Sequence, residues 1–131
     1  MSTREIPRNQ WRTFLDQFSR EHRAWLATIE RVRGGSRASV EALERPLASV
    51  VPHIAGSRVA RIDIRLQPDS HTGESIHVDG PASVRVDETP EGVVRSLEIV
   101  DEDGESTRVR FRVAPLPETL DGIAPGELPS T

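Results

Sequence analysis

The chain of 131 residues contains no cysteine, no tyrosine and no lysine, and only 4% of its residues are aromatic. Without cysteine there is no disulfide, no thiolate nucleophile and no cysteine-ligated metal centre. Without lysine there is neither a Schiff-base lysine nor the lysine of a phosphate-binding loop. The missing tyrosine removes phenolic acid–base catalysis. These absences exclude several enzyme classes, and we expect a protein without a cofactor.

Long apolar segments are absent too. No run approaches the roughly 20 residues that span a membrane, and residues 1–9 lack the apolar region of a secretory signal. We therefore expect a cytoplasmic protein with no membrane contact. The formal net charge of −4 argues against a protein that coats nucleic acid. All 17 basic residues are arginine, which we interpret as a coding bias.

The length fits one domain, since domains commonly run to roughly 100–150 residues. We expect a single α+β domain over residues 1–121 and a proline-rich flexible tail over residues 122–131. The domain begins with an amphipathic helix. Trp11, Phe14, Leu15 and Phe18 recur at helical spacing, so they form one apolar stripe that must be buried against another element.

After Arg23 the pattern changes to short strands that alternate apolar and polar residues. The predicted strands cover 25–32, 38–43, 47–54, 59–66, 75–79, 84–87, 95–100 and 107–113. Pro46 and Pro52 make the third of these an edge strand or an irregular segment. No later segment has the pattern of a second long helix, so a sheet is the partner that we expect for the helix.

The last two strands form the clearest hairpin, with a turn around Asp103-Gly104. A two-residue turn would place Arg108 opposite Ile99 and set charge against the buried face. A three-residue loop with a left-handed Gly104 instead pairs Leu97 with Val109, Ile99 with Thr107 and Glu98 with Arg108. The alternation of apolar residues therefore predicts the longer turn.

Together these elements predict an α+β fold in which one N-terminal amphipathic helix packs on a curved antiparallel sheet or small barrel of about six to seven strands. The predicted core combines the helix stripe with apolar positions of the first strand and the last hairpin. Its members are Trp11, Phe14, Leu15, Phe18, Trp25, Leu97, Ile99, Val109 and Phe111.

Three constellations have chemistry-bearing residues, and each has a plainer explanation. His71 and His77 lie near acidic residues, but their spacing matches no compact metal motif, so we expect solvated histidines and no metal. Asp69, Ser70 and His71 contain the residue types of a catalytic triad without a nucleophile elbow. The acidic segment 101–105 lacks the ligand spacing of a calcium loop and suits a hairpin tip.

Arginines concentrate on the outward faces of two predicted strands. They are Arg61, Arg65, Arg108, Arg110 and Arg112. If these strands are neighbours, their guanidinium groups could hold phosphates. Asp63, Asp87 and Glu98 fall on the same outward faces, however, and no aromatic residue alternates with the arginines as base stacking requires. Cross-strand ion pairs are therefore the favoured interpretation.

The two ends of the domain resemble a known family. The residues that carry the resemblance at the start are Ile6-Pro7, Trp11, Phe14-Leu15, Phe18-Ser19, His22 and Trp25-Leu26. The residues that carry it at the end are Leu97-Glu98-Ile99, Asp103-Gly104, Arg110-Phe111-Arg112 and residues 116–122. With these residues the chain resembles the bacterial domain of unknown function DUF5335 over nearly its whole length. The resemblance implies a small single-domain bacterial protein, and it implies no activity and no functional residues.

The sequence thus predicts an interaction or accessory domain without catalytic activity, which could pair with itself through an exposed sheet edge. The competing hypothesis is an anion or nucleic-acid binder that uses the arginine face. A third, a small-ligand binder, would need an apolar cavity in the curved sheet.

Overall fold

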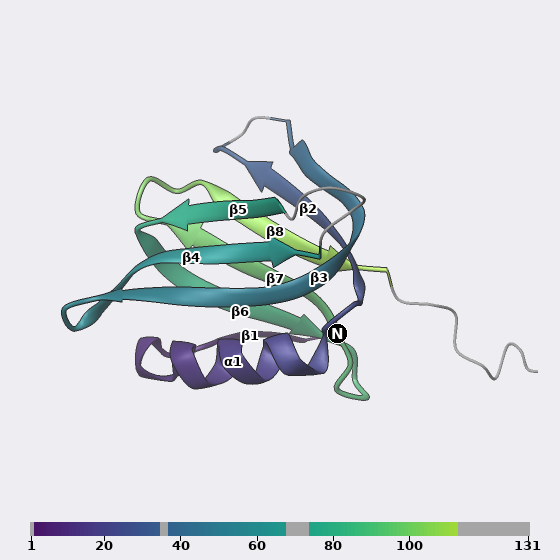
Figure 1. The fold of residues 1–131 in the computed structure, drawn as a ribbon, viewed down its shortest axis with the longest axis horizontal. Helices are drawn as coiled ribbons and strands as arrows, with labels where there is room; N and C mark the ends of the chain where they lie inside the picture. The colour runs from purple at the N-terminus through teal and green to yellow at the C-terminus, as the bar shows by residue number, and fades with distance from the viewer. Residues whose placement is uncertain (1, 35–36, 68–73, 113–131) are drawn as a thin grey trace, which may run out of the picture.

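The computed structural model describes residues 2–34, 37–67 and 74–112. These residues form an eight-stranded antiparallel sheet, one short 3-10 helix and one α-helix (Figure 1). In chain order the elements are β1 (Ser2–Glu5), η1 (Arg8–Gln10), α1 (Trp11–Glu21), β2 (Leu26–Val32), β3 (Ser39–Ala55), β4 (Arg58–Leu66), β5 (Glu74–Asp79), β6 (Pro81–Glu88), β7 (Val94–Asp101) and β8 (Ser106–Phe111). The fold therefore combines one helix with one sheet, as expected, but the sheet has eight strands instead of six or seven.

The sheet curls strongly without closing. Its strand order is β1-β6-β7-β8-β2-β3-β4-β5, so β5 and β6 lie near opposite ends. Only Gly80 separates β5 from β6 in the chain, and this residue has a φ of 60° that favours glycine. One residue can join the two strands only because the sheet bends until its ends approach each other. β1 and β5 do not pair, so the structure is a curved open sheet.

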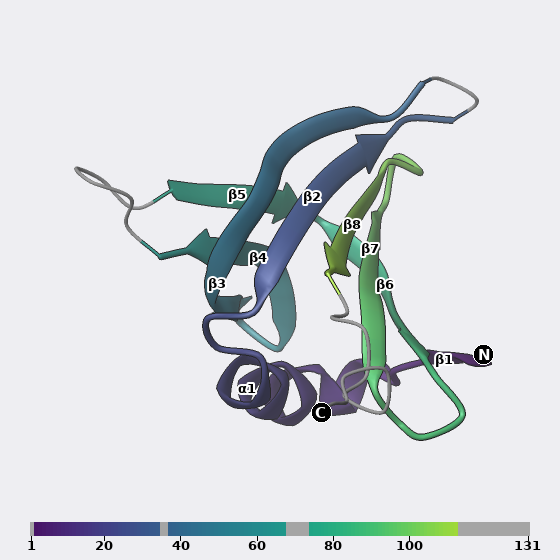
Figure 2. The same ribbon diagram turned by 90° about the vertical axis from the view of Figure 1, so that its right-hand side faces the viewer.

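Helix α1 covers one open end of the curled sheet and packs against β3 (Figure 2). A 3-10 turn precedes the helix, and His22 forms its C-cap. Its apolar stripe is buried as predicted, with Trp11, Leu15 and Phe18 at most 2% exposed. The Ser19 hydroxyl accepts a hydrogen bond from the Val50 N–H at 2.8 Å, which ties the helix to β3.

The prediction of two separate strands around Pro46 is wrong, because β3 runs without interruption from Ser39 to Ala55. Its first part pairs with β2 and its second part with β4, so among the described residues each part has one edge without a strand neighbour. The Val50 N–H points away from β4 to Ser19, and Pro52 is two residues further along the same edge. The hydrogen-bond donor that Pro52 lacks would have faced no strand there.

Seven of the nine predicted core residues are buried, and two are not. The seven are Trp11, Leu15, Phe18, Leu97, Ile99, Val109 and Phe111. Phe14 is partly buried against the core. Trp25 is 37% exposed, so its placement in the core is wrong. It precedes β2 and lies at the rim of the sheet, where His22 and Phe111 contact its indole ring.

The predicted register of the last hairpin is confirmed. Leu97 pairs with Val109, Ile99 with Thr107 and Glu98 with Arg108, and Gly104 has a φ of 88°. Strand β1, which pairs with β6, was not predicted, since its four residues contain no apolar alternation. The predicted tail over residues 122–131 lies outside the described residues.

Candidate functional site

The predicted arginine face is divided by the fold. Arg61 and Arg65 lie on β4, whereas Arg108 and Arg110 lie on β8 and Arg112 follows it. Strands β2 and β3 separate β8 from β4 in the sheet. The five arginines therefore do not form the single patch that neighbouring strands would have made.

Four of these five arginines contact a carboxylate, and two of them do so across adjacent strands. Arg110 forms two hydrogen bonds to Glu30, both of 3.1 Å. Arg108 lies 3.6 Å from Glu98. Arg112 lies 3.1 Å from Glu44. Arg61 lies 3.0 Å from Asp63, and among the described residues only Arg65 of the five has no such partner. The charges are thus largely balanced on the sheet itself, as the sequence favoured.

One hollow of about 280 Å³ opens on this outer face, between β1 and β8. Arg85, Arg108 and Arg110 line it together with Asp87 and Glu98. Arg85 and Arg108 both contact Glu98, at 3.8 Å and 3.6 Å. An anion entering this hollow would have to compete with Glu98 for these guanidinium groups.

A second cluster crosses β3, β4 and β5, where a buried carboxylate lies between two histidines. His53 Nε2 and Asp63 Oδ2 are 2.6 Å apart, and so are His77 Nδ1 and Asp63 Oδ1. An ionised carboxylate only accepts hydrogen bonds, so each imidazole donates its N–H to Asp63. Arg61 Nε is also 3.0 Å from Asp63 Oδ1, although this buried Nε forms no directed hydrogen bond.

The pKa of the Asp63 carboxyl is set by burial and by its partners. Burial alone raises this pKa, but the hydrogen bonds from His77 and His53 and the charge interactions with them lower it below its ordinary value of 3.8. Asp63 is therefore ionised at neutral pH. The sequence had placed Asp63 and His77 on a solvated face. The His77 side chain is 50% exposed there, whereas Asp63 is only 3% exposed.

The structure limits what the histidines could do chemically. Among the described residues, no group of three or more histidine, aspartate or glutamate side chains is arranged to hold a metal ion. No hydroxyl group in the described ranges forms a hydrogen bond with His53 or His77. Asp69, Ser70 and His71, which we considered for a triad and a metal site, lie outside the described residues.

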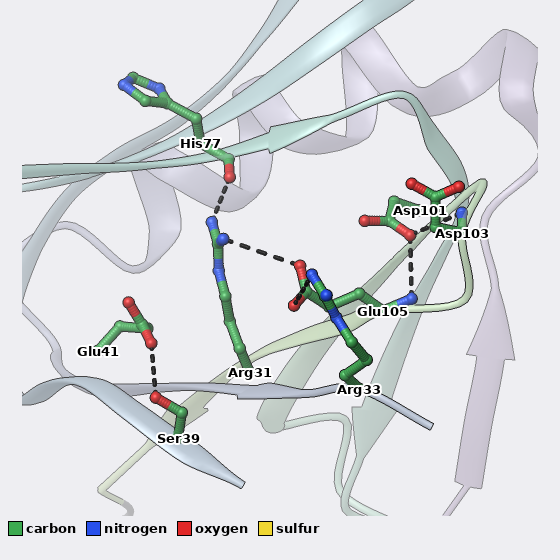
Figure 3. A network of polar contacts seen from close by, with 8 residues as sticks. All are labelled: Arg31, Arg33, Ser39, Glu41, His77, Asp101, Asp103 and Glu105. Carbon is green, nitrogen blue, oxygen red and sulfur yellow. Dashed lines mark hydrogen bonds and ion pairs between the residues drawn. The ribbon is translucent and has the colours of Figure 1, made fainter. Parts of the chain in front are cut away.

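A network of polar contacts connects β2 with β5 (Figure 3). Arg31 extends from β2 and donates a hydrogen bond to the carbonyl of His77 on β5, while Glu105 lies 3.8 Å from its guanidinium group. Glu105 also contacts Arg33 at 3.3 Å. Arg31 thus occupies part of the free edge of β5. The expected homodimer through a sheet edge stays a prediction. Within the described ranges, β1 is the edge without such a side-chain contact to a backbone group.

The largest aromatic grouping surrounds a hollow of about 530 Å³ beside α1. Arg4 of β1, the helix side chains Phe14, Gln17, Phe18 and Glu21, and the adjoining His22 and Trp25 form most of its lining. Glu88 and residues 92–94 complete it from the β6–β7 connection. Three separate segments of the chain therefore meet at this hollow.

His22 holds the aromatic rings of this hollow together. Its ring centroid lies 4.4 Å from that of Phe18 and 4.9 Å from that of Phe111, with the Phe111 ring nearly parallel. The indole of Trp25 stands almost perpendicular to His22 at 4.6 Å. His22 Nδ1 donates to the Phe18 carbonyl at 2.8 Å, since a carbonyl can only accept. His22 therefore contacts three other rings and a backbone carbonyl at once.

The sequence-based predictions do not include this hollow. His22 nevertheless continues the apolar stripe of the helix, four residues after Phe18 and eleven after Trp11. That spacing was the available signal that the imidazole faces inward. No sequence pattern predicts that Arg4, Glu88 and Val93 line the hollow, because their positions depend on the pairing of β1 with β6.

Fold and site together define a small antiparallel β domain with one covering helix and an aromatic hollow at the covered end. The chain belongs to DUF5335, a family of unknown function whose model matches residues 2–119. The resemblance noted in the sequence is thereby confirmed. No curated protein and no solved structure matches the chain. No helix within the described residues is long and apolar enough to cross a membrane.

Proposed function

We propose that this protein is a non-catalytic binding domain with an accessory role, and that the aromatic hollow beside α1 is its recognition site. The hollow of about 530 Å³ carries this proposal. Ligand pockets commonly measure roughly 300–1,000 Å³ and combine aromatic walls with a few polar groups. Its floor is rigid, since His22 packs between buried rings, while Trp25 stays 37% exposed at its margin.

Non-catalytic action is supported by the polar chemistry around the hollow. Its carboxylates are exposed or ion-paired, and the His22 imidazole is committed to the Phe18 carbonyl through Nδ1. A nucleophile paired with a base, which covalent catalysis requires, does not occur among the described residues that line it. Binding without reaction is the simpler use of such a surface.

The proposal is tested by following the two tryptophan indole N–H signals in an NMR screen of small molecules. Trp25 lines the hollow, whereas Trp11 is buried and donates its indole N–H to the Ile6 carbonyl. Ligands of the hollow should shift the Trp25 signal in a saturable way and leave the Trp11 signal in place. A diverse set of cations, anions and neutral compounds that never shifts Trp25 selectively would contradict the proposal.

The second candidate is an anion or nucleic-acid site at the hollow on the outer face, where Arg85, Arg108 and Arg110 converge. Glu98 and Glu30 already hold these groups, so we expect only weak binding of roughly 10⁻⁴–10⁻⁶ M that falls steeply with salt. Fluorescence anisotropy with single- and double-stranded oligonucleotides measures it. Sub-micromolar binding that is lost when Arg108 and Arg110 are both replaced by alanine would favour this candidate.

A further inference from the structure

We propose that the aromatic hollow binds a small organic cation, an alkylammonium group, between Trp25 and Glu21. This inference rests on the proposed binding role of the hollow and adds the chemical class of its ligand. Three observations carry it: the balance of charges around the hollow, the exposed indole, and a cation that already lies on one of its aromatic rings.

The charged groups that line the hollow leave one carboxylate unbalanced. They are Arg4, Glu21 and Glu88. Arg4 lies 3.6 Å from Glu88, so these two charges compensate each other. Glu21 accepts a hydrogen bond of 3.0 Å from the Gln17 amide, and no cationic side chain among the described residues contacts it. The hollow thus presents one negative charge without a counterpart.

The aromatic walls suit a positive charge. The face of an aromatic ring is negative, and tryptophan attracts cations most strongly of the three aromatic side chains. Trp25 is exposed at the hollow, while Phe18 and His22 form the buried floor. The guanidinium carbon of Arg4 lies 5.9 Å from the centroid of the Phe14 ring, within the range of a cation–π contact. One wall of the hollow therefore already accommodates a cation.

Other ligand classes fit the same surface less well. An anion would approach Glu21 and Glu88, and Arg4, the cation in the described lining, already interacts with Glu88. A neutral apolar ligand could cover Trp25, but it would remove water from the Glu21 carboxylate without replacing its interactions. An alkylammonium group satisfies the ring face and the carboxylate at once.

The experiment titrates the full chain with choline and follows tryptophan fluorescence. Choline carries a trimethylammonium group, and dimethylbutanol is its uncharged isostere, in which carbon replaces nitrogen. We expect a saturable change for choline and roughly tenfold weaker binding of the isostere, because the shapes match and only the charge differs. Propionate, as a small anion, should produce no saturable change.

Two matched variants locate the charge that matters. Glu21→Gln keeps the shape of an exposed helix side chain, so the protein should fold and melt as the parent does, while its choline affinity should fall about fivefold. Asp103→Asn removes one negative charge from the exposed tip of the β7–β8 hairpin, and this control should bind choline as the parent does. Circular dichroism melts confirm that both variants are folded.

The outcomes separate this inference from the proposed function. Equal affinity for choline and dimethylbutanol, or unchanged affinity in Glu21→Gln, would overturn the cation site while leaving a ligand-binding hollow. Absence of choline binding would also overturn it, and the proposed function would then stand only if the NMR screen finds another ligand that shifts Trp25. If no compound shifts Trp25, both are wrong.

Discussion

The outer faces of the two halves of the sheet carry similar charged residues in different arrangements. On β2 and β8, Arg110 and Glu30 form an exposed pair across neighbouring strands. The Arg110 side chain is 52% exposed. On β3, β4 and β5, the Asp63 side chain is 5% exposed and takes one hydrogen bond from each of two histidines. On β2 and β8 the charges form an exposed ion pair, and on β3, β4 and β5 they gather around a single buried carboxylate.

This difference shows that alternation alone does not set the energy of an outward-facing charge. Asp63 and Glu98 occupy equivalent positions in the alternating pattern, yet Glu98 is 25% exposed and Asp63 is nearly inaccessible. Water screens an exposed pair, and its contribution to stability is small. A buried carboxylate instead depends on the donors around it, since losing them leaves a charge without water.

The first prediction concerns a core residue, and it gives a reference value for the loss of stability against which both halves of the sheet can be compared. Trp11→Ala should lower the free energy of unfolding by about 3–5 kcal/mol, because it leaves a cavity under α1 and removes the indole hydrogen bond to Ile6. Chemical denaturation measures the loss. Leu43→Ala is the control at an apolar side chain that is 69% exposed, and it should change stability by less than about 0.5 kcal/mol. Similar effects for both variants would contradict the packing role of Trp11.

The second prediction breaks the gathered half of the comparison. Asp63→Ala removes the acceptor of His53 and His77 and the ion-pair partner of Arg61, and should cost about 1–3 kcal/mol. Asp63→Asn keeps the shape and one acceptor oxygen, so its loss should be smaller. Urea unfolding of the two variants and the parent gives the comparison. If the free energy of unfolding of Asp63→Ala is within about 0.5 kcal/mol of that of the parent, the Asp63 cluster contributes no more to stability than a surface ion pair does.

Much of the fold was predictable where neighbouring residues determine the structure. The stripe Trp11, Leu15 and Phe18 depends on helical spacing alone, and the β7–β8 register follows from alternation and a tight turn. The helix is one continuous segment and the hairpin joins two consecutive strands, so the local spacing of apolar residues is enough to predict both.

The curvature and the sites depend on contacts between distant segments. Pro52 is tolerated in β3 because β2 begins opposite Pro46 and does not extend beside Pro52, which no local pattern reveals. Asp63 is buried because His53 and His77 approach from two other strands. The hollow joins Arg4 to residues of the β6–β7 connection, nearly ninety positions later. These contacts between distant residues follow from the order of the strands in the sheet, and the alternation of apolar and polar residues does not determine that order.

The third prediction sharpens the comparison by pH. The pKa of Asp63 is lower in the folded protein than in the unfolded chain, so its contribution to stability is complete above the ordinary value of 3.8 and is lost as the pH falls through the folded value. The difference in unfolding free energy between the parent and Asp63→Asn should therefore shrink as the pH is lowered from about 5 to about 2.5. Urea unfolding across this range tests the sign. A difference that grows on acidification would contradict the lowered pKa.

The fourth and smallest effect is expected in the half with separate pairs. Arg110 and Glu30 form two parallel hydrogen bonds, but Arg110 is half exposed, so its guanidinium exchanges these contacts for water at little cost. A double-mutant cycle with Arg110→Ala and Glu30→Ala should give a coupling of roughly 0.2–1 kcal/mol that decreases in high salt. A coupling as large as the loss in Asp63→Ala, or one that salt leaves unchanged, would remove the distinction between the two halves. A small coupling that salt screens would mean that the Arg110–Glu30 ion pair contributes little to stability, whereas the buried Asp63 carboxylate on β4 contributes much more.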